Sequence, residues 1–473
     1  MKTLFYYLGY LLIISAFFRI VPIVTALIYD EPVMSFFLAA FLSLALGGVL
    51  LWTSRPKEDD REKGLTLSHG LMLAAVSFIV LPLISALSFL SSFDYSYIDA
   101  VFESISGFTT TGLTLYDSLE YIPKSLLMWR AMTQWIGGIG IVMVFLFIFS
   151  RLHAHDYMHI SEAETSAQST MALYKSQGFT EKMEGGLKKS VTNVMLIYIG
   201  YSVIGIILLL IVGLPVYDAI AMTFTSLSTG GFSVNDVFYS NGWQLAILSL
   251  LMLIGSISFL THNKLLQRQW KKFFFAFEKN VFFVFLILII LVTLTVTTDI
   301  RLVLFQLISA FTTTGYSISK IAMLPQLFIM MIMAGMMMGG SIASTAGGIK
   351  VFRIYYLLRA IPWSIKKLAS PPHSVIPLKI HGAQTDEAKL VNIGVFVFLY
   401  FLILFAGTVI FMIFGHSFLN ASFQIVSALG TVGLQTMELA SLNPFLKFVL
   451  IIAMLFGRLE IFPVLILIRK IFK

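Results

Sequence analysis

Long apolar runs recur along the chain, separated by short polar connections. Ten of them approach the roughly 20 residues that an α-helix needs to cross a bilayer. The pattern predicts an all-α polytopic membrane protein with ten transmembrane helices. The runs lie at residues 4–29, 35–53, 68–92, 125–150, 190–214, 243–263, 281–298, 326–345, 390–415 and 445–468.

Four shorter apolar stretches lie between some of these runs, near residues 99–108, 218–227, 299–311 and 420–429. They are too short to cross a membrane, and their length is typical of re-entrant or core segments. Each stretch opens near a polar residue of a type that caps helices. We therefore expect four short helices with caps at Asp99, Asp218, Asp299 and Asn420.

These stretches belong to a repeat. The blocks DAVFESISGFTTTGLT, DAIAMTFTSLSTGGFS and NASFQIVSALGTVGLQ align without a gap, and LVLFQLISAFTTTGYS follows the same pattern. Each block predicts a short helix followed by an extended Thr-Gly segment, at residues 110–114, 229–233, 313–317 and 431–435. Every block lies between two long apolar runs, so the unit of span, short helix, segment and span occurs four times.

Extended backbone at membrane depth survives only where it is buried in protein or lines a cavity. Four such segments can meet around one axis, where their carbonyl oxygens replace the hydration shell of a monovalent cation. Glycine adopts the backbone angles that aim successive carbonyls at one axis, and threonine adds a hydroxyl oxygen. Small-residue packing motifs are the disfavoured alternative, because they belong inside spans. The predicted selectivity filter comprises Thr110, Thr111, Gly112, Leu113, Thr229, Gly230, Gly231, Phe232, Thr313, Thr314, Gly315, Tyr316, Thr431, Val432, Gly433 and Leu434.

Charge sets the expected orientation. Of 473 residues, 58% are hydrophobic and only 12% charged, and the net charge is +8. If both termini are cytoplasmic, the inner segments carry 25 lysines and arginines, whereas the outer segments carry five, including Arg130. The basic excess is thus explained by topology, and nucleic-acid binding is not needed. The absence of cysteine excludes disulfides and thiolate metal sites.

Glycine and other small residues interrupt the apolar run at 326–345. The interruption predicts either a packing face or a broken helix that crosses beneath the filter and obstructs it as a gate. A nucleotide-binding P-loop is excluded, because Lys350 is followed by Val351 and no strand precedes it. The candidate gate residues are Gly339, Gly340, Ser341, Ser344, Thr345, Gly347 and Gly348.

Three charged residues inside apolar regions need a reason to be there. Arg458 is a functional candidate, because a buried arginine is costly. The alternatives are an ion pair with Glu460 or a side chain that extends to the cytoplasm. Glu103 either bonds the backbone that supports the filter or lies at a solvated mouth, and Arg19 is expected to be structural or interfacial.

The sequence resembles the Trk-type members of the Trk/Ktr/HKT superfamily of potassium transporters. The resemblance covers nearly the whole chain and rests on WIGGIGIV (135–142), the four Thr-Gly segments, GGSIASTAGGIKVFR (339–353) and GRLEIFPVLIL (457–467). It implies potassium preference, because glycine occupies all four filter positions, including Gly112. It also implies that Arg458 lies near the cavity below the filter, opposes cation passage and contacts the intramembrane loop.

The expected organisation is four pore repeats around one central pore, preceded by two extra helices. Pore repeats are expected at 66–150, 190–270, 271–370 and 390–473. The third holds the gate, the two extra helices occupy 1–65, and cytoplasmic connections occupy 151–189 and 371–389.

The inner loops are too small to form a nucleotide-binding domain. The resemblance implies a cytoplasmic ring of RCK-type nucleotide-binding subunits, docked on 151–189, 264–280 and 350–389, and a homodimer of the membrane chain. No HExxH, GxSxG or paired membrane carboxylates indicate an enzyme, and no cofactor is expected. We expect gated potassium uptake across the cytoplasmic (inner) membrane of a bacterium. The alternative is potassium symport with protons or sodium by alternating access.

Overall fold

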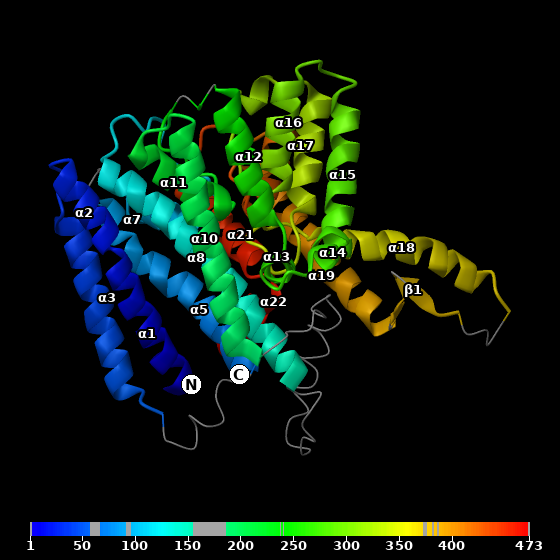
Figure 1. Cartoon of the computed structure of the whole chain (residues 1–473), viewed down its shortest axis with the longest axis horizontal. Helices are drawn as coiled ribbons and strands as arrows, with labels where there is room; N and C mark the ends of the chain where they lie inside the picture. The colour runs from blue at the N-terminus through cyan, green and yellow to red at the C-terminus, as the bar shows by residue number, and fades with distance from the viewer. Residues whose placement is uncertain are drawn as a thin grey trace.

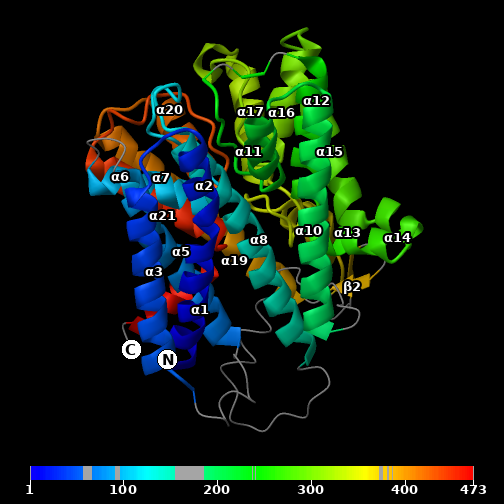
Figure 2. The same ribbon diagram turned by 60° about the vertical axis from the view of Figure 1, so that its left-hand side comes forward.

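The computed structural model describes residues 2–56, 67–90, 96–154, 186–236, 238–239, 241–371, 376–380, 383–385 and 387–471. The described part is a bundle of α-helices plus one antiparallel hairpin of β1 (Leu378–Ile380) and β2 (Ala383–Thr385). The start of α1 and the end of α22 lie at the same end of the bundle in both views (Figures 1 and 2).

The first two membrane-span candidates, residues 2–28 and 34–53, pack as a pair beside the rest of the bundle (Figure 1). Arg19 lies at the break between α1 and α2 and is fully buried. Its Nη1 donates to Ser15 Oγ (2.9 Å) and Ser43 Oγ (3.2 Å), and its guanidinium lies 4.9 Å from the ring centre of Trp129. Arg19 is therefore structural, since it ties this pair to α8. The elements are α1 (Lys2–Phe18), α2 (Ile20–Ile28) and α3 (Met34–Thr53).

The rest of the chain contains four helices of twelve residues each, where the four short helices were expected. They are α7 (Tyr97–Phe108), α11 (Val216–Leu227), α16 (Ile300–Phe311) and α20 (Phe418–Leu429). The elements around them are α5 (Leu67–Ser85), α6 (Leu87–Leu90), α8 (Lys124–Ala154), α10 (Gly186–Ile211), α12 (Gly242–Ser256), α13 (Phe259–Leu266), α14 (Trp270–Phe274), α15 (Phe277–Thr293), the 3₁₀ turn η3 (Ile321–Met323), α17 (Gln326–Met338), α18 (Val351–Leu368), α19 (Glu387–Ile413), α21 (Pro444–Arg458) and α22 (Phe462–Ile471).

Six described helical stretches are long and apolar enough to cross a membrane. The number rises to eight if two sharply bent pairs each form one span: α12 with α13, bent by 100°, and α21 with α22, bent by 109°. Helix α17 has only 13 residues, although a full span is expected near 326–345. The chain is thus a multi-pass helical membrane protein, and the number ten stays a prediction.

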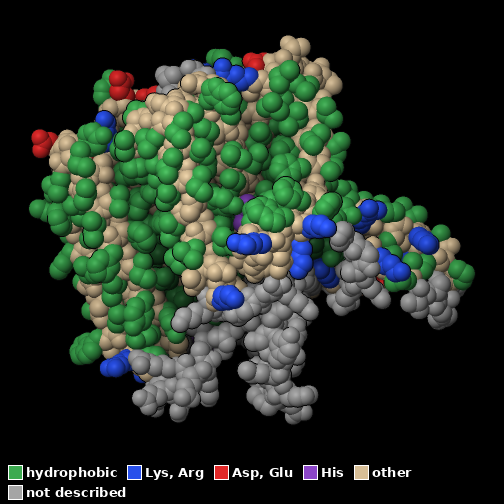
Figure 3. All heavy atoms as spheres, in the orientation of Figure 1, with side chains coloured by type: hydrophobic (Ala, Val, Ile, Leu, Met, Phe, Trp, Pro, Cys, Tyr) green, Lys and Arg blue, Asp and Glu red, His purple; other side chains and the backbone are tan. Residues whose placement is uncertain are grey.

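The surface is divided in the way that a bilayer requires. In the view of Figure 3, a broad band of hydrophobic side chains separates an end rich in Lys and Arg from an end with Asp and Glu. Large apolar side chains such as Phe41, Ile211 and Phe398 are 65–74% exposed. Such a large apolar surface is stable only against lipid.

The predicted helix caps are right at one position and wrong at three. The carboxylate of Asp299 accepts from Leu302 N (3.0 Å) and caps α16, as expected. The N-caps of α7, α11 and α20 are instead Ser96, Pro215 and Ser417, because these helices begin two residues before the aligned polar position. Asp99, Asp218 and Asn420 therefore lie in the first turn, where the first two make tertiary contacts.

Candidate functional site

The four Thr-Gly segments share one unusual backbone conformation. The threonine that opens each segment and the glycine two residues later both have positive φ. A non-glycine residue rarely adopts this conformation and keeps it only where its surroundings hold it. The φ angles are 51° for Thr110, Thr229 and Thr431, 57° for Thr313, 82° for Gly112, 77° for Gly231, 88° for Gly315 and 94° for Gly433.

The same four glycines are the points of closest approach between segments. A Cβ added at each would overlap a backbone carbonyl oxygen of the next segment, and the fourth glycine faces the first segment. The segments therefore contact one another in cyclic order and form a closed ring of backbone, built from parts of the chain more than 300 residues apart. The contacts join Gly112 to Gly230, Gly231 to Thr314, Gly315 to Val432 and Gly433 to Thr111.

One cavity of about 620 Å³ opens onto this ring, and all four glycines line it. We call it the outer cavity, because it lies on the side of the ring away from segment 339–350. Phe232, Tyr316 and Leu434 also belong to its lining. All four Thr-Gly segments thus contribute residues to the lining of one cavity.

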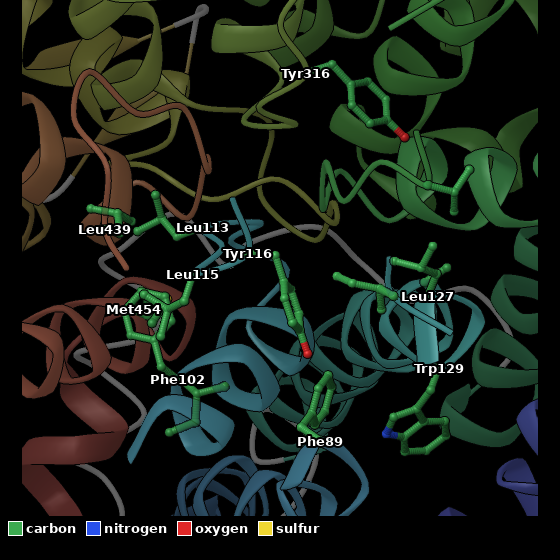
Figure 4. Close-up of a cluster of buried hydrophobic side chains, with 14 of the residues drawn as sticks. Phe89, Phe102, Leu113, Leu115, Tyr116, Leu127, Trp129, Tyr316, Leu439 and Met454 are labelled. Carbon is green, nitrogen blue, oxygen red and sulfur yellow. The ribbon is translucent and has the colours of Figure 1, made fainter. Parts of the chain in front are cut away.

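Side chains in the segments are occupied by packing. Leu113 is fully buried and lies beside Leu439 in the core (Figure 4). The hydroxyl of Tyr316 reaches across to α11, where it hydrogen-bonds to the hydroxyls of Thr225 and Ser226. The groups left to act at the ring are therefore backbone carbonyls and the hydroxyls of the opening threonines.

Hydroxyl groups on the short helices hold the segments from behind. Ser106 donates to the carbonyl of Leu113 (2.6 Å), and Ser309 donates to the carbonyl of Tyr316 (2.7 Å). In the fourth repeat the hydroxyl of Ser427 instead accepts from the backbone N–H of Gly433 (3.1 Å). The aligned serine thus fixes the backbone in three of the four repeats.

A buried charge pair supports the first segment. Glu103 accepts from the backbone N–H of Leu115 (2.5 Å) and the hydroxyl of Thr114 (2.7 Å), as the first interpretation of this residue expected. Arg130 lies 3.4 Å from Glu103 and donates to Thr114 Oγ1 (2.9 Å). Arg130, assigned to an outer segment from the sequence, is therefore 1% exposed within α8. Its guanidinium also lies 3.9 Å from the ring centre of Phe232, in the second segment.

The second segment depends on a residue that the sequence analysis missed. Gln134 of α8 donates to the carbonyl of Gly230 (2.6 Å) and accepts from the N–H of Phe232 (3.1 Å). The available signal was a gap in the repeat: the position of Glu103 is Gln306 and Gln424 in two other repeats, but the apolar Met222 in the second. Gln134 supplies the missing polar group from another helix.

Segment 339–350 lies against the opposite side of the ring. Helix α17 ends at Met338, and regular helix resumes only at Val351. Thr345 Oγ1 accepts from Thr229 Oγ1 (3.3 Å), and Gly347 N donates to Thr313 Oγ1 (2.8 Å). A Cβ on Gly347 would overlap the hydroxyl of Thr431. The segment therefore touches the opening threonine of three of the four repeats.

Other candidate gate residues fold the segment and attach it. Gly339 and Gly348 approach so closely that a Cβ on either would crowd the other's backbone. Ser341 N donates to the carbonyl of Ser256 (2.9 Å), and Ser344 Oγ donates to the carbonyl of Ser341 (2.6 Å). Gly340 likewise lies close to Ser256 and Ala346. The break in the helix is thus held in this arrangement by contacts with the end of α12.

Arg458 connects this segment to the rest of the bundle. Its Nη1 donates to the carbonyl of Thr345 (2.6 Å) and its Nη2 to the carbonyl of Gly137 (2.9 Å). The expected alternative partner, Glu460, instead pairs with Arg353 at 2.5 Å. The space bounded by Gly347, Arg458 and their neighbours is too small for a water molecule. Arg458 thus attaches the segment to α8 and α21.

Comparisons with known proteins agree with this architecture. A family model described as a cation transport protein, TrkH, matches residues 32–299 and 289–473. An uncharacterised cation transporter of Methanocaldococcus jannaschii is 30% identical over 98% of this chain and 94% of its own length. The Trk system potassium uptake protein TrkH of Salmonella typhimurium is 30% identical over 98% and 97%.

A solved structure extends the likeness to the fold. The crystal structure of the potassium transporter TrkH from Vibrio parahaemolyticus superposes with a TM-score of 0.84, at 24% identity, over 98% of both chains. The match to the family model and the two relatives span almost the entire chain, including both sides of the ring. The chain therefore belongs to the TrkH family of cation transport proteins, within the Trk branch that its motifs indicate.

Proposed function

We propose that this chain takes up potassium through a gated, channel-like pore whose selectivity filter is the ring of four Thr-Gly segments. The observation that carries the proposal is the cyclic contact of the four glycines with the carbonyl of the next segment. A closed ring of peptide groups, opening onto one cavity, is suited to replace the water around a monovalent cation. The curated relatives named as potassium uptake proteins support potassium as that cation.

The hydroxyls of the opening threonines fit the same role. Thr110 and Thr431 are fully buried, and among the described residues their Oγ1 atoms have no hydrogen-bond partner. A buried polar oxygen without a partner is costly unless a water or an ion satisfies it. A dehydrated cation at the inner end of the ring would satisfy both oxygens.

The gate in this proposal is segment 339–350, which closes the inner side of the ring. Ions would pass from the outer cavity through the ring and then past this segment once it moves. The two hydrogen bonds of Arg458 stabilise the closed arrangement of the segment. Its positive charge, placed on the proposed ion path, also opposes the passage of cations.

The chain is proposed to act with partners in a bacterial inner membrane, with both termini cytoplasmic. The basic segments 264–280 and 350–389 would dock a ring of RCK-type nucleotide-binding subunits, and two copies of the chain would form a homodimer. Most of the third expected docking segment, 151–189, lies outside the described residues. The four repeats, with the boundaries expected from the sequence, would be the four quarters of the pore.

Uptake into liposomes tests the proposal. Vesicles holding the purified chain are given potassium, rubidium or sodium as the sole cation, without a proton gradient. The pore requires downhill uptake of potassium and rubidium under these conditions. Uptake that occurs only when a proton or sodium gradient is imposed would favour the alternative, a coupled symporter.

Gly112→Ser tests the ring itself. We expect this variant to admit more sodium relative to potassium, because the added side chain would overlap the carbonyl of Gly230 and widen or tilt that quarter. Gly48→Ser is the matched control, since a Cβ there meets open space. An unchanged potassium-to-sodium uptake ratio in Gly112→Ser, with normal expression, would remove Gly112 from the filter.

A further inference from the structure

Four charged residues stand at equivalent places around the outer cavity. Each lies five positions after one of the ring glycines, so the fourfold pattern of the segments extends beyond them. All four are exposed, and all four line the outer cavity. We call them the charge ring: Asp117, Asp236, Lys320 and Glu438.

The charge ring is not uniform. Three of its members are acidic and the fourth, from the third repeat, is Lys320, so their formal charges sum to −2 instead of −4. Asp236 is held in place, because it accepts from Ser118 Oγ and Leu119 N at 2.6 Å each. Among the described residues, Lys320 makes no ion pair that would cancel its charge. The lysine therefore acts on the potential of the cavity.

That potential discriminates between ions of different charge. A negative mouth concentrates cations near the pore, and a confined cavity with low-dielectric walls strengthens the effect. A potential that concentrates a monovalent cation by some factor concentrates a divalent cation by the square of that factor. A strongly negative ring thus raises the local concentration of divalent cations most. One positive charge in the ring lowers their local concentration more than it lowers that of potassium.

We propose that Lys320 is a specificity-determining residue, which holds the outer mouth attractive to monovalent cations while keeping divalent cations from occupying and blocking it. The inference rests on the proposed function, because the outer cavity must be the mouth of the ion path. It predicts that the charge of the side chain at position 320, and not the shape of that side chain, determines how strongly Mg²⁺ inhibits potassium uptake.

The test compares Lys320→Gln and Lys320→Glu with the unmodified chain in the liposome uptake assay. At low ionic strength, about 0.01 M, where the screening length is about 30 Å, we expect faster initial potassium uptake. For a unit charge about 10 Å from a potassium ion in water, we expect the initial uptake rate to rise roughly two-fold in Lys320→Gln and roughly four-fold in Lys320→Glu. The rise should vanish near 1 M salt, where the screening length is about 3 Å.

Mg²⁺ provides the second readout. External Mg²⁺ at millimolar concentration should inhibit potassium uptake by Lys320→Glu much more than uptake by the unmodified chain. Asp117→Asn and Glu438→Gln should act in the opposite direction and slow uptake at low ionic strength. Arg301→Gln is the matched control: it removes an outer positive charge from an exposed residue that does not line the cavity.

Each outcome has one meaning. The inference is wrong if Arg301→Gln reproduces the effect, if the effect persists at high salt, or if Lys320→Glu is no more sensitive to Mg²⁺ than the unmodified chain. Loss of potassium uptake by the unmodified chain would instead overturn the proposed function. A change in the potassium-to-sodium ratio without any Mg²⁺ effect would count against Lys320 as a divalent determinant.

Discussion

Single residues behind the ring show how four unequal sequences produce four similar segments. Each segment needs partners for its backbone groups, because buried peptide groups without partners are costly. In the first repeat Glu103 provides them from its own short helix, whereas in the second repeat Met222 cannot. Gln134, on the helix that follows the first segment, fills that place and bonds both the carbonyl and the N–H side of the second segment.

Gln134→Leu therefore should affect the second quarter of the ring. The change leaves the carbonyl of Gly230 and the N–H of Phe232 without partners, at a cost of about 1 to 3 kcal/mol for each buried group. We expect a lower potassium-to-sodium uptake ratio and a lower midpoint of thermal unfolding in detergent. Gln244→Leu, which makes the same chemical change at a 3.3 Å bond to Val212 outside the ring, should leave the ratio unchanged. If the potassium-to-sodium uptake ratio is the same in Gln134→Leu and Gln244→Leu, then Gln134 does not position the second segment.

At the scale of elements, the broken helix between α17 and α18 is the part of the bundle whose geometry is most constrained by others. Segment 339–350 receives contacts from α12, from three Thr-Gly segments and from α21. Lys350 adds a further bond, since its ammonium donates to the carbonyl of Ala346 within the segment. In the proposed gating, opening the path would break several of these contacts together, so the segment should move as one unit.

Removing the link from α21 should shift that unit towards opening. In Arg458→Ala the carbonyls of Thr345 and Gly137 lose their charged donor. The loss of even one such bond, about 1.5 to 3 kcal/mol, corresponds to roughly a ten-fold or greater rise in potassium uptake. Arg469→Ala, at an exposed arginine in the last turn of α22, is the control. Normal uptake by well-expressed Arg458→Ala would show that the segment does not limit flux.

At the scale of the whole molecule, helices of the last repeat pack against helices of the first. Lys447 of α21 and Asp99 of α7 form an ion pair of 2.8 Å across this contact, although they lie 348 positions apart in the sequence. Both side chains are largely buried, at 7% and 15% exposure. The pair therefore joins the two ends of the repeat series near the outer side.

Lys447→Met should loosen this contact. The variant leaves the Asp99 carboxylate without its partner, and we expect it to lower stability by about 1.5 to 3 kcal/mol. A lower midpoint of thermal unfolding in detergent would report the change. Adding Asp99→Asn to Lys447→Met should restore part of the loss, because it removes the uncompensated charge. If the double variant is less stable than Lys447→Met alone, the two residues do not act as a pair.

The sequence predicted those features that depend on local pattern. The four short helices follow from apolar stretches of limited length, and the positive φ of the glycines follows from the shared Thr-x-Gly spacing. The residues alone did not predict Gln134, the burial of Arg130 or the pairing of Glu460 with Arg353. The contact of Arg458 with the intramembrane loop, at Thr345, was implied by the family resemblance. These contacts depend on how α8 and α21 are oriented against other repeats, which local sequence patterns do not specify. The apolar Met222 indicates that the second segment lacks a polar partner on its own helix, but not which helix supplies one. Two of the three wrong helix caps have a similar cause, since Asp99 and Asp218 make tertiary contacts instead of capping. At the third, the hydroxyl of Ser417 accepts from the N–H of Asn420 and caps α20 in its place.

The cyclic contact among four glycines also bears on how such a protein changes over generations. In a ring built by four identical subunits, one mutation changes all four quarters of the ring at once. Here each quadrant has its own codons, so one nucleotide change alters a quarter of the ring and leaves the other three intact. Graded intermediates between one ion preference and another are thereby open to drift and to laboratory engineering, one quadrant at a time.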